Sequence, residues 1–143
     1  MSKWKTILVG VDGSPSSRKA LTWAAAEAAD HGAELVVLTV WHPTLLPPMG
    51  SGGVPPSPVP DPSQRATEDL LTVIKAELGE DPPVVVQPRV KEGNPAEVLI
   101  KQSADADLLV VGTRGRGGFK GLLLGSVSQH VAAHAKCPVT VVR

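Results

Sequence analysis

The chain has 143 residues, of which 42% are hydrophobic, and its 14 basic residues balance 14 acidic ones. This length suits one domain with a buried core, and the hydrophobic fraction excludes a chain that is disordered throughout. The balanced charge gives no electrostatic reason to expect a nucleic acid or an anionic membrane as a partner.

Hydrophobic runs alternate with helical patterns along the whole chain. Several runs are continuous in Val, Ile and Leu, which is typical of strands that are covered on both faces of a parallel sheet. In chain order we predict strand Thr6–Val11, helix Ser14–His31, strand Glu34–Trp41, helix Pro62–Leu78, strand Val84–Val90, helix Asn94–Ala104, strand Asp107–Gly112, helix Ser126–Ala135 and strand Val139–Val142. This alternation predicts a doubly wound α/β sheet.

The helix boundaries rest on capping residues. Ser14 followed by Pro15 is typical of a helix start, and Gly32 is typical of a helix stop. Asn94 followed by Pro95 repeats the same start signal before the third helix.

One segment, Pro43–Pro62, is rich in proline and interrupts the pattern. It holds eight of the 14 prolines, so we predict a surface loop at 43–62 within a single domain that spans residues 1–143. The uncharged stretch 35–60 has the length of a membrane span, but its prolines exclude an inserted helix, and we predict no membrane segment. Cys137 is the only cysteine, which excludes an intrachain disulfide and favours a reducing cytoplasm.

Six of the 14 glycines lie between Gly112 and Gly125, where a predicted buried strand ends and a helix begins. Glycines let backbone N–H groups approach a phosphate closely, and a helix N-terminus adds unpaired donors. Ser126 and Ser128 add hydroxyl groups in the first turn of that helix. The segment lacks the lysine of the Walker motif and the third glycine of the dinucleotide motif. A loop whose glycines only form turns is the alternative interpretation.

A second candidate lies after the first strand, where Asp12 follows Gly10 and Val11. Ligands of open α/β sheets bind outside the carboxyl ends of strands, at the point where the winding reverses. A carboxylate there can accept from ribose hydroxyls or from adenine, or can hold Mg²⁺. An Asx turn at the helix entry is the competing interpretation of Asp12.

These residues resemble the universal stress protein family. Gly112-x-x-Gly115, nine residues, then Gly125-Ser126 is similar to the ATP-binding pattern of that family. The segments Val9–Ser14 and Pro138–Val142 are similar to its first and last strands, so the resemblance covers the whole chain.

The resemblance implies a single-domain open parallel sheet of five strands in the order 3-2-1-4-5, with helices on both faces. It also implies ATP, with Mg²⁺, as the ligand, and a homodimer that pairs through the C-terminal strand, residues 139–142. Carried over by position, Gly10, Asp12 and Val40 line the adenosine pocket. The residues around the ribose and phosphates are then Gly112, Arg114, Gly115, Gly125, Ser126, Val127 and Ser128.

Other reactive side chains favour structural roles. His130 and His134 have a zinc-binding spacing, but no nearby carboxylate or cysteine completes a site, so we predict no metal held by the protein alone. Cys137 has no candidate base beside it and is predicted to be an inert thiol. Trp41 is interpreted as a packing residue that could border the adenine pocket beside Val40.

The sequence therefore predicts a cytoplasmic, nucleotide-dependent stress or signalling protein that binds ATP. An enzyme of the same fold, a cyclic-nucleotide binder and an interaction module without ligand are the alternatives. No residue pattern for efficient turnover is present, so we expect slow ATP hydrolysis at most.

Overall fold

A computed structural model describes residues 4–42, 61–113 and 125–143 of the chain. The predicted loop at 43–62 lies outside the described residues apart from Asp61 and Pro62. These two residues form the N-cap and the first residue of a helix.

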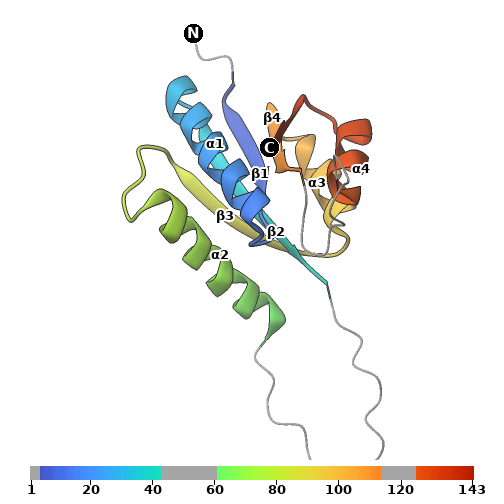
Figure 1. Ribbon diagram of the computed structural model, residues 1–143, viewed down its shortest axis with the longest axis horizontal. Coiled ribbons are helices and arrows are strands. Elements are labelled where there is room, and N and C mark those ends of the chain that lie inside the picture. Colours follow the sequence, from blue (N-terminus) through green and yellow to red (C-terminus); the bar gives the residue numbers. More distant parts are fainter. Residues whose placement is uncertain (1–3, 43–60, 114–124) are drawn as a thin grey trace, which may run out of the picture.

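Five strands and four helices alternate along the described chain (Figure 1). In order they are β1 (Thr6–Gly10), α1 (Pro15–His31), β2 (Glu34–Trp41), α2 (Pro62–Leu78), β3 (Val86–Glu92), α3 (Pro95–Ser103), β4 (Leu108–Gly112), α4 (Ser126–His134) and β5 (Val139–Val142). The strands form one sheet in the order β3-β2-β1-β4-β5, and all four neighbouring pairs are parallel. The predicted α/β fold and its strand order are therefore confirmed.

The predicted bounds hold best where the sequence carries strong signals. The bounds of β2, α2 and β5 agree with the prediction at both ends. Strand β3 begins at Val86 and ends at Glu92, two residues later than predicted at each end. It is an edge strand paired only with β2, and its exposed residues Gln87 and Arg89 break the apolar run that the prediction followed.

Side-chain caps start three of the helices. Ser14 Oγ accepts from the backbone N–H of Ser17 at the start of α1. Asp61 accepts in the same way from Ser63 before α2, and Asn94 accepts from Glu97 before α3. Each cap satisfies a backbone donor that the helix leaves unpaired.

Helices cover both faces of the sheet and create two cores. On one face α1 and α2 pack over Ile7, Val9 and Leu35, and on the other face α3 and α4 pack over Leu8 and Leu109 (Figure 1). Adjacent residues of β1 thus serve opposite cores, which explains its continuous apolar run. None of the helices in the ranges 4–42, 61–113 and 125–143 is long and apolar enough to cross a membrane.

The start of β1 is tied to the start of β4 by one carboxylate. Asp107 Oδ2 accepts from the backbone N–H groups of Lys5 and Thr6, each at 2.9 Å. Asp107 was predicted as the first residue of β4, but the strand begins at Leu108. Its side chain instead caps β1 and fixes these two central strands side by side.

Strands β1 and β4 mark the point where the winding of the sheet reverses. From β1 the chain proceeds to β2 and β3 on one side, whereas β4 and β5 lie on the other side. Because all strands are parallel, the carboxyl ends of β1 and β4 meet at the same edge of the sheet. This crevice is the place where open α/β sheets bind ligands.

Candidate functional site

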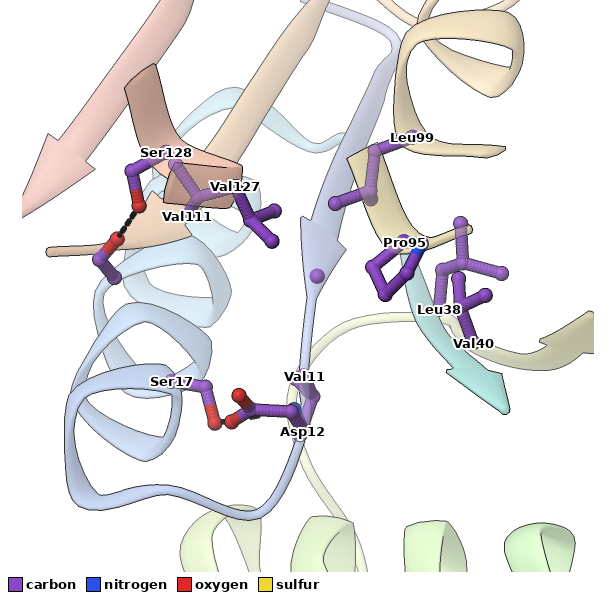
Figure 2. Close-up of a pocket in the computed structure, with 12 residues that line it drawn as sticks. Val11, Asp12, Ser17, Leu38, Val40, Pro95, Leu99, Val111, Val127 and Ser128 are labelled. Atoms are coloured by element: carbon purple, nitrogen blue, oxygen red, sulfur yellow. Dashed lines mark hydrogen bonds between the residues drawn. The ribbon is translucent and has the colours of Figure 1, made fainter. Parts of the chain in front are cut away.

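A cavity of about 270 Å³ opens at the crevice between the carboxyl ends of β1 and β4 (Figure 2). Its volume lies just below the range of roughly 300–1,000 Å³ that small-molecule pockets occupy. The strands contribute Gly10, Leu38, Val40, Val111 and Gly112, the segment after β1 contributes Val11 and Asp12, and the helices contribute Ser17, Pro95, Leu99, Val127 and Ser128.

Most of the cavity wall is aliphatic. Leu38 and Val40 from β2 and Pro95 from the start of α3 lie together on one side, and Val127 from α4 lies on the other (Figure 2). Leu99 reaches into the space near Gly10, whose missing side chain leaves room for it. Such walls suit the faces of a flat, weakly polar group such as a purine base.

Asp12 is the only charged side chain among the described residues that line this cavity. Its Oδ1 accepts from the backbone N–H of Ser14 at 2.9 Å, which is an Asx turn at the entrance to α1. The residue as a whole is exposed to solvent and lies at the mouth of the cavity. The turn holds the carboxylate in place, and the structural and binding roles are therefore compatible.

Gly112, at the end of β4, lies directly against the first turn of α1. A Cβ atom on Gly112 would come within 2.7 Å of the backbone carbon and oxygen of Ser16, and closer still to Ser16 Oγ. Such contacts are shorter than real Cβ atoms show, and most of them involve backbone that cannot rotate away. Packing of α1 on β4 therefore requires a glycine here, whatever the cavity binds.

Two further contacts join the end of β4 to α4. Ser128 Oγ donates to the carbonyl oxygen of Gly112 at 2.5 Å, and the backbone N–H of Gly125 donates to the carbonyl oxygen of Thr113 at 2.6 Å. Thr113 Oγ1 also lies 3.3 Å from Ser16 Oγ. The hydroxyl proton of Ser128 is thus used within the protein, and only its oxygen lone pairs remain for other partners.

Helix α4 begins at this cavity without a side-chain cap. Its N-cap is Gly125, which has no side chain to accept a hydrogen bond from the first turn. The other three helices of the described chain each have a serine, aspartate or asparagine in that position. The first backbone N–H groups of α4 therefore need acceptors from elsewhere, and the helix dipole favours a negative charge there.

The structure describes eight of the ten predicted site residues, and six of them line the cavity. These six are Gly10, Asp12, Val40, Gly112, Val127 and Ser128. Gly125 and Ser126 start α4 beside it, and Arg114 and Gly115 lie outside the described residues.

Several residues of the cavity wall were not predicted from the sequence. Leu38, Pro95 and Leu99 were interpreted only as strand and helix residues, yet they form one side of the cavity. The signal for Pro95 was available, because a helix start that follows a strand also lies at the carboxyl edge of the sheet.

Three further side chains with reactive or metal-binding groups are Cys137, His130 and His134. Burial raises the pKa of the Cys137 thiol, and the nearby charge of Asp107 raises this pKa further, so the reactive thiolate is disfavoured. The rings of His130 and His134 lie beside each other on α4. No group of three or more potential metal ligands occurs within 4–42, 61–113 and 125–143.

With this geometry established, comparisons with known proteins identify the family. The model of the universal stress protein family matches residues 3–143. The chain belongs to the universal stress protein family. Curated relatives agree: a universal stress protein from Mycolicibacterium smegmatis is 42% identical over 139 residues, which are 96% of this chain and 45% of that protein. The chain thus spans about half the length of the mycobacterial relatives it matches.

Two further relatives match this chain over nearly their whole length. A universal stress protein from Thermus aquaticus is 35% identical over 147 residues. The match covers 98% of this chain and 99% of that protein. A crystal structure of a universal stress protein in complex with cAMP is 30% identical, with a TM-score of 0.66, and covers 98% of this chain and 97% of its own. The family relationship therefore extends over the entire sheet.

The packing of Gly112 yields a stability prediction. Gly112→Ala should lower the free energy of unfolding by about 1–3 kcal/mol, because backbone of β4 or α1 must move to admit the methyl group. Gly10→Ala should change it by less than about 1 kcal/mol, since the added Cβ would lie 3.1 Å from the methyl groups of Leu99, which can rotate. Urea unfolding followed by circular dichroism measures both. Equal effects of the two substitutions would contradict the close contact at Gly112.

Proposed function

We propose that this chain binds an adenine nucleotide, ATP with Mg²⁺ foremost, and acts as a nucleotide-dependent stress or signalling protein. The observation that carries the proposal is the aliphatic cavity at the β1–β4 crevice, which ends at the uncapped start of α4. An aliphatic surface that suits the adenosine group and a helix start that suits the phosphates thus lie side by side.

The base and ribose suit the part of the cavity nearest β1 and β2. Val40 and Pro95 offer aliphatic surface for the faces of a purine. Asp12 offers a carboxylate that can accept from the ribose hydroxyls, and its position is set by the Asx turn. Similarity to a universal stress protein in complex with cAMP supports an adenine nucleotide as the ligand.

The phosphates suit the other end, at the first turn of α4. The backbone N–H groups that follow Gly125 have no acceptor on the side chain of the N-cap residue, and a phosphate oxygen would satisfy them. Mg²⁺ would be held chiefly by phosphate oxygens, as is usual for this ion. In this arrangement the charge of the nucleotide is balanced by a helix dipole and a metal ion.

Binding rather than turnover is proposed. The described wall of the cavity holds Asp12 as its only charged residue, and this carboxylate is already part of a turn. Slow hydrolysis of ATP is compatible with the site and is measured by steady-state phosphate release. Cyclic AMP is the second candidate ligand, because the similar structure with 30% identity was solved with it.

The cytoplasmic location that the sequence suggested stays a prediction.

The central test fills the cavity from α4. Val127→Trp should raise the dissociation constant for MgATP at least about tenfold, or about 1.4 kcal/mol, because the indole occupies space that the nucleoside needs. Isothermal titration calorimetry with ATP, ADP and cyclic AMP on the unmodified chain and the variant provides the measurement.

The matched control is Ala132→Trp, which adds the same side chain to an exposed position of the same helix. It should bind as the unmodified chain does. Absence of any heat of binding with all three nucleotides would overturn the proposed function. Equal dissociation constants for Val127→Trp and the unmodified chain would show that the nucleotide does not bind in this cavity.

A second substitution separates the two roles of Asp12. Asp12→Asn keeps an oxygen that can accept from the N–H of Ser14 but removes the charge, so the turn should persist. Because a bond to a charged acceptor is stronger, the dissociation constant for ATP should rise about fivefold to tenfold while the melting temperature stays unchanged. An unaltered dissociation constant would restrict Asp12 to its role in the turn.

We also propose a homodimer that pairs through β5. This strand is one edge of the sheet and its residues Val139–Val142 are all half-buried, whereas the other edge strand, β3, carries Pro88, which lacks a backbone donor. Sedimentation velocity at micromolar concentrations should give the mass of two chains. Val141→Pro should shift the population to monomer, because the parallel register with β4 turns the backbone N–H of Val141 toward the open edge of the sheet. A monomer throughout for the unmodified chain would refute the pairing.

A further inference from the structure

Helix α4 carries two histidines on consecutive turns, away from the residues that line the cavity. His130 and His134 are both exposed, and their ring centres lie 4.9 Å apart with the ring planes inclined by 48°. Residues four apart on a helix share one face, and two histidines in this relation can bind the same metal ion.

The ring separation matches the geometry of a shared metal ion. An ion bound at about 2.0–2.1 Å to one nitrogen of each ring, with an angle of about 90–110° between the bonds, places the ring centres about 4.5–5.2 Å apart. The observed 4.9 Å lies within this range, so the spacing of the two rings is compatible with one shared ion.

Both imidazoles are available for such an ion. Neither ring forms a hydrogen bond or ion pair with another residue in the part of the chain that the structure describes, apart from the contact between the two rings. Imidazole nitrogens suit Zn²⁺, Cu²⁺ and Ni²⁺ and have little affinity for Mg²⁺ or Ca²⁺. The ligand type thus selects one class of ion.

We propose that His130 and His134 form a two-histidine site for a divalent transition-metal ion. This site is separate from any Mg²⁺ that accompanies a nucleotide, because it uses nitrogen ligands on an exposed face of α4. Water completes the coordination, since no third protein ligand lies nearby among the described residues.

The site has a structural consequence for α4. This helix is only nine residues long, and helices of that length are marginal without tertiary support. A metal ion that joins two consecutive turns binds the folded helix and not the unfolded one, so it stabilises the helix. The first turn of the same helix contributes Val127 and Ser128 to the cavity.

The test titrates NiCl₂ into the chain without a histidine tag, by isothermal titration calorimetry at pH 7.5. Ni²⁺ is the probe because it does not oxidise Cys137. We expect one ion per chain, removal by EDTA, and a dissociation constant that rises at least tenfold in His134→Ala and equally in His130→Ala. The melting temperature should rise with Ni²⁺ in the unmodified chain and stay constant in both variants.

A relocation variant provides the matched control. The double substitution His134→Ala with Ala132→His keeps the number of histidines but places them two residues apart, on different faces of α4. It should bind Ni²⁺ as weakly as His134→Ala does, and circular dichroism should show an unchanged fold. Tight binding by the relocation variant or by His134→Ala, or no binding to the unmodified chain at 1 mM Ni²⁺, would overturn the proposal. None of these results depends on a nucleotide.

Discussion

The site depends on one steric constraint, the contact between Gly112 and the backbone of Ser16. Because no Cβ separates them, the first turn of α1 packs directly onto the end of β4. The carbonyl group of the same glycine accepts from Ser128 and so brings the first turn of α4 to the same point. Two helix starts are therefore held at the carboxyl ends of the two central strands, with the cavity between them. Any larger residue at position 112 would separate these elements.

In this arrangement residues with structural roles also lie in or beside the wall of the cavity. Asp12 closes the turn into α1 and also lies at the mouth of the cavity. Gly125 donates to the carbonyl oxygen of Thr113, and as an N-cap without a side chain it provides no acceptor for the first turn of α4. Families that bind nucleotides on α/β sheets depend on such helix starts. Gly112 and Asp12 therefore combine strong structural demands with a place in the wall of the cavity.

Much of the fold was predictable because its signals are local. Continuous apolar runs indicated a parallel sheet, and capping residues such as Ser14 and Gly32 marked helix ends. The strand order came from the family resemblance, since periodicity does not say which strands are neighbours. The predicted bounds of strand β3 were wrong by two residues, because an edge strand with polar residues lacks the apolar pattern.

The cavity was predicted only in part. Leu99 has the pattern of any buried helical residue, and its contribution to the wall depends on how α3 crosses the sheet. The role of Gly112 in helix packing was also not visible in the sequence, because Ser16 lies 96 residues away along the chain.

The proposed function requires the phosphates to lie at the first turn of α4. Backbone amide chemical shifts test this position most directly. In a nitrogen-15 spectrum, MgATP should shift the backbone amides of Val127 and Ser128 strongly, because their N–H groups would donate to phosphate oxygens. Adenosine should shift the amides near Val40, and it should shift those at the start of α4 much less than MgATP does. Equal shifts at the start of α4 with adenosine and with MgATP, or shifts with neither, would contradict the placement of the phosphates.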